Sequence, residues 1–187
     1  MYRTDLRERL EGTLDDDPRR EAAAGDRLAS VLVPIVEGTS LLFTKRTEHL
    51  PRHPGEISFP GGLQHDEDAD IEATALRETE EELGIAPSQV DVLGALPSFH
   101  TFVSSILIVP FVGILDPRPR LRPNPGEIAE VLEYPVRALI DAETTVEWRR
   151  DRGVYRGYAY EMDDHTIWGA TAMILHSFLE LIRRDDA

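Results

Sequence analysis

Two short motifs decide how this chain folds: Phe59-Pro60-Gly61-Gly62 and, after an acidic loop, Arg77-Glu78-Thr79-Glu80-Glu81-Glu82-Leu83-Gly84-Ile85. On a helix, residues three and four apart are neighbours, so Glu78 would lie beside both Glu81 and Glu82. Glu80 would point away from them. Because like charges at these spacings destabilise a helix, the three clustered carboxylates require a bound cation.

Acidic residues are concentrated around the second motif. From Leu63 to Ile85 there are nine acids and one base, Arg77, a net charge of -8 out of -15 for the whole chain. Hard carboxylate oxygens, in a chain without cysteine, favour Mg2+ or Mn2+ over zinc or copper. The alternative is a solvated acidic surface helix, but the preceding Gly-Gly pair and the stop at Leu83-Gly84 argue against it.

The composition is that of one globular domain, with 187 residues, 41% hydrophobic and 29% charged. The absence of cysteine, of a signal-peptide pattern and of a long apolar run predicts a cytoplasmic protein that does not enter a membrane. The net charge of -15 argues against nucleic acid as a partner. A small anionic molecule remains a suitable partner if metal ions bridge it to the carboxylates.

The apolar patterns predict a mixed α/β (α+β) fold. Strands are expected at 29–36, 40–46, 57–59, 90–96, 103–115, 144–150 and 154–162, with hairpins at 37–39 and 151–153. Helices are expected at 2–11, 71–83, 136–141 and 169–184. We expect 1–27 to be an N-terminal helical extension and 28–187 to be the main domain. No βαβ unit repeats, so a doubly wound nucleotide fold is disfavoured.

The helix at 71–83 has a predicted inward side. It is formed by residues at helical spacing: Ala73, Leu76, Thr79 and Leu83. Gly84 follows as a C-terminal cap, because the left-handed conformation there favours glycine. Gly61-Gly62 is expected to form a turn, and since it precedes a loop it does not match a phosphate-binding glycine motif at a helix start.

The second motif resembles the signature of the Nudix hydrolases, in which Arg-Glu is followed by Glu-Glu and by glycine with an apolar residue. Arg77-Glu78, Glu81-Glu82 and Gly84-Ile85 match these positions. The first half of the signature departs, with Leu63 where glycine is expected and Ala69 where glutamate is expected. One inserted residue would give Gly62 the glycine role and leave Asp68 or Asp70 near the acidic position.

The upstream sequence is similar to the coenzyme A pyrophosphatase branch of that family. Leu42-Phe43-Thr44-Lys45-Arg46, then Gly55, then Phe59-Pro60-Gly61-Gly62 follow the additional motif of this branch, and Ile167-Trp168-Gly169-Ala170-Thr171-Ala172 resembles another of its segments. Thr47 and Pro51 depart from the motif, which has serine or alanine and arginine at these positions. These departures bear on substrate selectivity more than on hydrolysis.

The resemblance implies a mixed β-sheet sandwiched between helices, with a catalytic loop-helix-loop at 61–85 that hydrolyses a diphosphate bond with bound divalent metals. It implies Glu78 and Glu82 as principal metal ligands, with Glu81 as a third. The Gly62 carbonyl is a further candidate oxygen, and Arg77 is expected to orient a carboxylate. The general base stays open among four glutamates: Glu78, Glu81, Glu127 and Glu130.

Coenzyme A would be cut to 4'-phosphopantetheine and adenosine 3',5'-bisphosphate. The candidate substrate contacts are Lys45, Arg46, Arg52 and Gly61. Phe99 and Phe102 are candidates for a pocket or for the core, and the loop histidines, including His65, are expected to be solvated. ADP-ribose, NADH or a dinucleotide polyphosphate is the alternative substrate, a non-catalytic nucleotide-sensing module is the alternative function, and a homodimer stays open.

Overall fold

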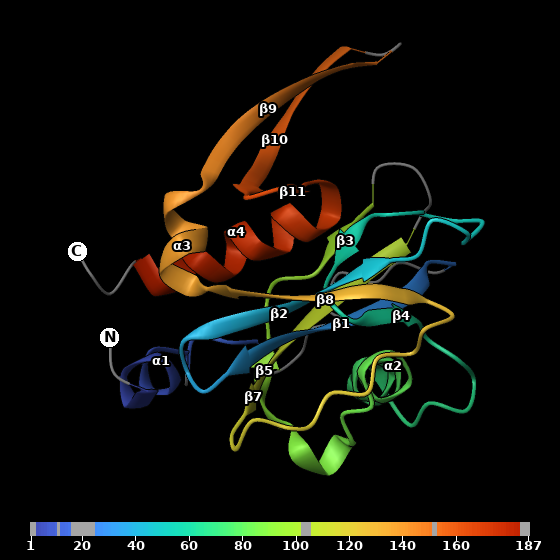
Figure 1. The fold of residues 1–187 in the computed structure, drawn as a ribbon, viewed down its shortest axis with the longest axis vertical. Coiled ribbons are helices and arrows are strands. Elements are labelled where there is room, and N and C mark those ends of the chain that lie inside the picture. The colour runs from blue at the N-terminus through green and yellow to red at the C-terminus, as the bar shows by residue number, and fades with distance from the viewer. Residues whose placement is uncertain (1–2, 11, 16–24, 102–105, 151–152, 184–187) are drawn as a thin grey trace.

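The computed structural model describes residues 3–10, 12–15, 25–101, 106–150 and 153–183 (Figure 1). Its helices are α1 (Arg3–Leu10), α2 (Ile71–Leu83), α3 (Val136–Asp141) and α4 (Gly169–Arg183), with a short 3-10 turn at Pro87–Gln89. The strands up to the middle of the chain are β1 (Arg27–Val36), β2 (Ser40–Arg46), β3 (Ile57–Ser58), β4 (Gly61–Leu63), β5 (Asp91–Ala95) and β6 (Phe99–His100). The later strands are β7 (Ile106–Leu115), β8 (Ile128–Pro135), β9 (Glu143–Arg150), β10 (Gly153–Met162) and β11 (His165–Ile167).

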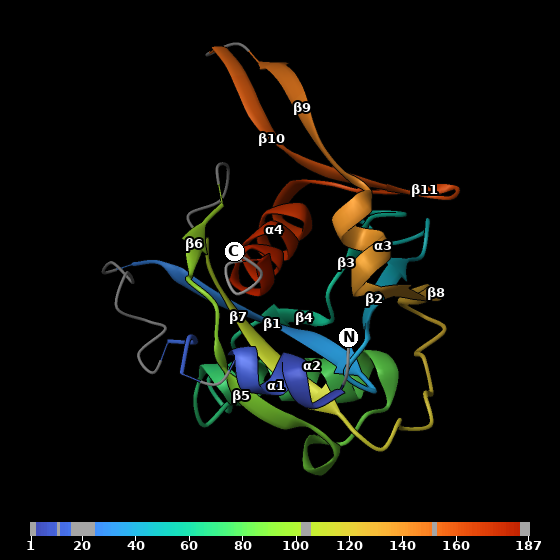
Figure 2. The same ribbon diagram turned by 90° about the vertical axis from the view of Figure 1, so that its left-hand side faces the viewer.

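The main sheet is mixed. Its strands follow the order β3-β2-β1-β7-β5, with β4 paired to β1, β6 to β7 and β8 to β2. β1 and β7 run parallel from Arg27↔Ile106 to Val36↔Leu115, and the other pairs are antiparallel. A second sheet, β11-β10-β9, is joined to the first through α3 and α4, and its β9–β10 ribbon extends away from the body (Figures 1 and 2).

Helices cover both faces of the main sheet, because side chains alternate between its faces along each strand. On β1, Leu32 packs with Ile71 and Ala75 of α2. Val33 and Ile35 face the opposite way, into the larger core that includes the apolar residues of α4. Figure 1 shows α2 and α4 on opposite sides of the sheet. The expected mixed sheet between helices is therefore confirmed.

The N-terminal helix packs against this body. Leu6 and Leu10 of α1 are buried in the same core as the α4 side chains. Arg9 Nη1 donates a hydrogen bond to the Ile182 carbonyl oxygen of α4 over 3.1 Å. Among the described residues no helix is both long and apolar enough to span a bilayer.

The predicted helices at 71–83 and 136–141 match α2 and α3, and the hairpin of β1 and β2 is also confirmed. Three short or polar strands were missed, namely β6, β8 and β11. Gly61-Gly62 was wrongly predicted as a turn, because β4 pairs with β1 along these residues. The inward side of α2 was also wrong in part, since Ala73 and Leu76 are only half-buried.

Candidate active site

The ends of α2 are fixed by two capping residues. At its start, the Asp70 carboxylate accepts a hydrogen bond from the Ala73 backbone N–H over 2.8 Å. At its end, Gly84 adopts a left-handed conformation with φ 69°, and its N–H donates to the Glu80 carbonyl. A rigid, capped helix holds the glutamates between these ends at constant spacing.

The glutamates continue the sheet-facing stripe of α2. Ile71 and Ala75 are buried on this stripe, and Glu78 and Glu82 follow at the next positions of the same face. Glu82 is only 3% exposed, whereas Glu80 is exposed. Hydrophobic patterning alone did not predict this, because a carboxylate occupies a position where an apolar side chain is normal.

The two glycines let β4 pass between β1 and α2. A Cβ atom on Gly61, which has φ 157°, would lie 2.3 Å from the Ser30 carbonyl oxygen. A Cβ atom on Gly62 would lie 2.6 Å from the carboxyl carbon of Glu78. Any side chain at position 62 would therefore displace the Glu78 carboxylate, so this glycine leaves the space in which that carboxylate sits.

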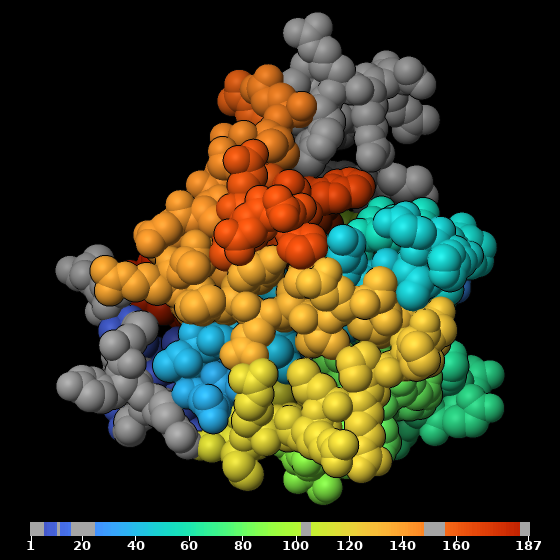
Figure 3. All heavy atoms as spheres, in the orientation of Figure 1, coloured from blue at the N-terminus to red at the C-terminus, as the bar shows by residue number. Residues whose placement is uncertain are grey.

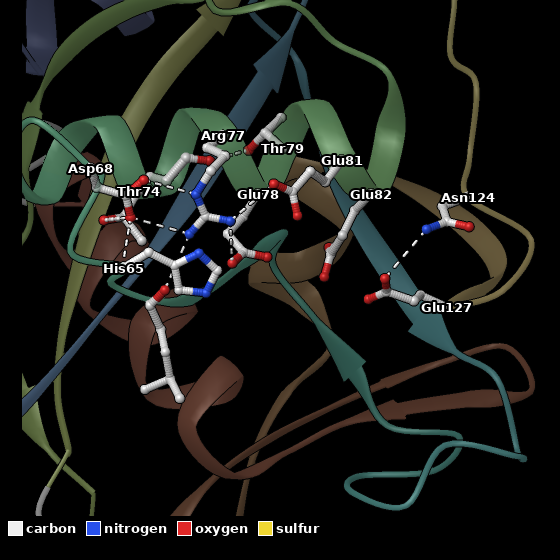
Figure 4. A network of polar contacts seen from close by, with 12 residues as sticks. His65, Asp68, Thr74, Arg77, Glu78, Thr79, Glu81, Glu82, Asn124 and Glu127 are labelled. Carbon is white, nitrogen blue, oxygen red and sulfur yellow. Dashed lines mark hydrogen bonds and ion pairs between the residues drawn. The ribbon is translucent and has the colours of Figure 1, made fainter.

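Arg77 joins the acidic loop to the helix (Figure 4). Its Nε donates to Asp68 Oδ1 over 2.8 Å, and its Nη1 donates to Glu78 Oε1 over 2.8 Å and to Glu81 Oε1 over 3.1 Å. Its Nη2 donates to the Leu63 carbonyl oxygen over 3.2 Å. One guanidinium thus fixes the orientation of two of the glutamates relative to the end of β4.

Asp68 anchors this network, which the sequence left undecided between Asp68 and Asp70. The Arg77 guanidinium, helped by the His65 backbone N–H and the Thr74 hydroxyl, holds the pKa of Asp68 well below its usual range. Asp70 is occupied with capping the helix instead. The sequence alone could not choose between Asp68 and Asp70, because the residue inserted relative to the Nudix signature can be placed on either side of position 68.

Glu82 lies in an unfavourable environment for a carboxylate. Burial, reinforced by the negative charge of Glu78, raises its pKa to about 8. Arg46 Nη1 is 3.8 Å from Glu82 Oε1, but Oε2 is buried without a hydrogen-bond partner. Burial also raises the pKa of Glu78.

A second wall of the site comes from the loop that leads to β8. The backbone N–H of Asn124 donates to the Glu82 carbonyl oxygen over 2.9 Å, which holds the loop on the end of α2. In the space-filling view this loop, in yellow, lies beside α2, in green (Figure 3). Asn124 Nδ2 donates to Glu127 Oε1 over 3.3 Å, and the Glu127 charge adds to the raised pKa of Glu82. Figure 4 shows the two carboxylates pointing toward each other.

The candidate substrate contacts do not all meet at this site. Arg46 lies on the α2 side of β2, against Glu82. Lys45 is on the other face, where its Nζ is 3.5 Å from His165 Nε2. Glu130, one of the candidate bases, lies on β8, with Oε2 also 3.5 Å from His165 Nε2.

Of the remaining candidates, Arg52 is exposed in the loop between β2 and β3. Phe99 is half-buried on β6 and packs against the larger core. Phe102 lies outside the described residues. Within the described part of the chain, neither Arg52 nor Phe99 forms a hydrogen bond or ion pair with the glutamates.

The donor set fits a hard divalent cation. Among the described residues, no group of three or more acidic or histidine side chains is arranged closely enough to coordinate a metal ion by itself. However, Glu82 Oε2 is buried without a partner, and the Glu78 carboxylate, which Arg77 holds through Oε1, lies beside Gly62 on the same face of α2. A cation of the Mg2+ or Mn2+ class would satisfy both.

Comparisons with known proteins agree with this arrangement. The sequence profile of the NUDIX domain matches residues 26–157. A relative from Photorhabdus laumondii, named uncharacterized Nudix hydrolase NudL, is 35% identical over 170 residues, covering 89% of this chain and 90% of the relative. A protein of the same name from Pectobacterium atrosepticum is 37% identical over 154 residues, covering 80% of each chain.

Solved structures share the fold. The MutT protein from Methanosarcina mazei Go1 superposes with a TM-score of 0.59 at 16% identity, covering 89% of this chain and 100% of that one. An Ap4A hydrolase from C. elegans gives a TM-score of 0.55 at 15% identity, covering 84% and 98%. Because the domain profile spans most of the chain and the NudL relatives align along at least four-fifths of it, the chain belongs to the Nudix hydrolase family.

Proposed function

We propose that this Nudix hydrolase cuts the diphosphate of coenzyme A or its acyl and disulfide forms, with Mg2+ or Mn2+, into 4'-phosphopantetheine and adenosine 3',5'-bisphosphate. The main support is the contact between Arg46 and Glu82. It joins the upstream motif, which resembles the coenzyme A branch, to the carboxylates of the Nudix helix. A diphosphate held by these carboxylates through a cation would lie within reach of the Arg46 guanidinium.

In this proposal Glu78 and Glu82 hold the metal, with Glu81 and the Gly62 carbonyl as further oxygens. The bound cation would neutralise the diphosphate oxygens, activate the attacking water and stabilise the leaving phosphate. Arg77 keeps Glu78 and Glu81 oriented through its hydrogen bonds. Their carboxylates therefore keep their positions when substrate enters.

We assign proton abstraction to Glu127. Its carboxylate faces Glu82 from a different element and is not bonded to Arg77. It can therefore accept the proton of the attacking water at a carboxylate oxygen, because it is not one of the α2 glutamates that would hold the metal. Arg46, Arg52 and the Gly61 backbone would bind the anionic substrate, whereas Lys45 and Phe99 would reach only its outer groups.

Another nucleoside diphosphate derivative is the second candidate substrate. The departures at Thr47 and Pro51 favour it, since Thr47 is 7% exposed and its hydroxyl is buried without a partner beside Arg46. Thr47 also donates its backbone N–H to the Glu127 carbonyl oxygen over 2.8 Å, so one of the two departures lies next to the loop that carries Glu127.

One substrate panel separates these proposals. Purified protein with Mg2+ or Mn2+ would be offered coenzyme A, acetyl-CoA, ADP-ribose, NADH and diadenosine tetraphosphate, with products identified by mass. Release of 4'-phosphopantetheine as the fastest reaction supports the first proposal. Faster cleavage of another compound would replace it with the second, and binding without any cleavage would favour a sensing module.

A further inference from the structure

His65 is the histidine nearest to the Nudix carboxylates. It follows β4, and Figure 4 shows its imidazole beside the Arg77 guanidinium and Glu78. Burial raises the pKa of Glu78, and His65 is close enough for its charge to oppose that rise in part. An imidazole beside Glu78 can donate a hydrogen bond to a ligand that also contacts the Glu78 carboxylate.

The backbone under His65 is held in place. The His65 N–H donates to Asp68 Oδ2 over 2.9 Å, and the same carboxylate accepts two hydrogen bonds from Arg77. The preceding residue, Gln64, donates its N–H to the Leu28 carbonyl of β1 over 2.9 Å. The residue is therefore positioned by the same network that orients the glutamates, although its side chain is exposed.

Open space lies next to the imidazole. A hollow of about 360 Å3 is lined by Asp26, Leu28, Gln64, His65, Asp66 and Asp68. The side chains of Gln64, His65 and Asp66 form no hydrogen bond or ion pair with any residue that the structure describes. The His65 imidazole is thus available to a molecule that occupies this hollow.

We propose that His65 is a substrate-binding residue, whose imidazole N–H donates to a non-bridging phosphate oxygen of the diphosphate, while the hollow accommodates the group attached to that phosphate. The inference rests on the proposed function in taking a diphosphate as the bound group, but it does not depend on coenzyme A being the substrate. A neutral imidazole already carries one N–H donor, so the contact does not require a charged ring. The surrounding carboxylates make a hydrogen-bond donor valuable here, because the other side chains of the hollow are mainly acceptors.

The test compares three variants of the acidic loop with the wild type. His65→Leu removes the donor, His65→Gln restores an N–H donor, and Glu67→Leu is the control, since Glu67 is an exposed residue of the same loop outside the hollow. We expect His65→Leu to raise KM about tenfold, as for loss of a hydrogen bond to a charged group, with kcat changed less than about threefold. His65→Gln should return KM to within about threefold of wild type, and Glu67→Leu should leave it unchanged.

The outcomes separate the two proposals. If coenzyme A is hydrolysed and KM is the same in wild type and His65→Leu, or if Glu67→Leu raises KM equally, the role of His65 is wrong and the proposed function stands. If coenzyme A is not hydrolysed, the same KM comparison is made with whichever panel compound is cleaved. If none is cleaved, calorimetric binding of ADP-ribose and coenzyme A replaces KM, and equal dissociation constants in wild type and His65→Leu overturn the inference.

Discussion

Two glutamates, the buried Glu82 and the half-buried Glu143, lie in opposite electrostatic environments. Glu143, at the base of the β9–β10 ribbon, accepts hydrogen bonds from Tyr160 over 2.7 Å and from Arg183 over 3.1 Å, and is 3.1 Å from His176 Nδ1. Burial raises its pKa, but these three partners outweigh burial, so the net pKa is below the usual value. Glu82 keeps one oxygen without a partner, and its pKa rises to about 8.

The difference separates a carboxylate that is paired within the protein from one that the protein leaves without a full set of partners. A carboxylate that has hydrogen-bond partners on several elements links them together, as Glu143 links β9 and β10 to α4. A buried charge that is left unsatisfied weakens the fold unless something else binds it. In the proposed function, a cation and a diphosphate would compensate for that destabilisation at Glu82, beside Glu78 and Arg46.

The largest expected effect is on turnover at Glu82. Glu82→Gln keeps the shape of the side chain but removes the negative charge that would hold the metal. We expect kcat on the best panel substrate to fall about a thousandfold, equivalent to about 4 kcal/mol of transition-state stabilisation. The far-ultraviolet circular dichroism spectrum should be unchanged, and a variant that turns over at the wild-type rate would rule out Glu82 as a metal ligand.

The next effect concerns stability against pH in the metal-free protein. The folded-state pKa of Glu82 is raised from 4.5 to about 8, so its stabilising contribution is complete below pH 4.5 and is lost as pH rises through 8. We expect the unfolding free energy of wild type, relative to Glu82→Gln, to fall by on the order of a few kcal/mol over this window.

Urea unfolding of both proteins in a metal chelator, at several pH values, measures this difference. If the unfolding free energies of wild type and Glu82→Gln changed in parallel with pH, Glu82 would ionise as easily in the folded as in the unfolded chain. Saturating Mg2+ should reduce the fall in wild type, because a ligand that binds only the folded state stabilises it.

A smaller effect, on stability and not on chemistry, is expected at Glu143. Glu143→Ala leaves the buried Tyr160 hydroxyl and Arg183 without their shared acceptor, which should lower the unfolding free energy by about 2–3 kcal/mol. Turnover per folded molecule should stay near that of wild type. The control is Glu147→Ala on the same strand, whose ion pair with Arg156 is exposed and should contribute under about 1 kcal/mol. Equal losses of unfolding free energy in the two variants would show that the hydrogen bonds of Glu143 stabilise the fold no more than an exposed ion pair does.

The smallest effect is expected at Glu80, which belongs to the same run of glutamates. Its side chain is exposed on the far side of α2 from Glu78 and Glu82. Glu80→Gln should change kcat by less than about twofold and the unfolding free energy by less than about 0.5 kcal/mol. A loss of turnover approaching that of Glu82→Gln would mean that total charge, and not the position of each carboxylate, governs the site.

Local signals in the sequence were sufficient for α2 and for the β1–β2 hairpin. The bounds of α2 follow from its periodicity and from Gly84, whose left-handed conformation needs no tertiary contact to be favoured. Side chains alternate along β2, so Lys45 and Arg46 face opposite sides of the sheet. The prediction that both contact the substrate did not take this alternation into account.

Other features depend on residues far away in the chain. β8 carries exposed residues such as Ala129 and Glu130 and is a strand because it pairs with β2, about ninety residues earlier. The burial of Glu82 depends on where β4 and the loop at Asn124 lie. The position of His65 beside Glu78 likewise follows from the Asp68–Arg77 network, so its sequence neighbours gave no sign of it.

The parallel pairing of β1 with β7 has a consequence for the order of folding. Arg27 pairs with Ile106, so the closed segment between them contains β4, the acidic loop and α2. Parallel pairing over such a separation carries a high contact order and forms slowly, because loop entropy is lost before the strand contacts are gained. The helix that carries the glutamates can form early by local contacts, but the wall against which Glu78 and Glu82 are buried is completed only when this distant pair closes. We therefore expect the candidate site to be among the last parts of the molecule to assemble.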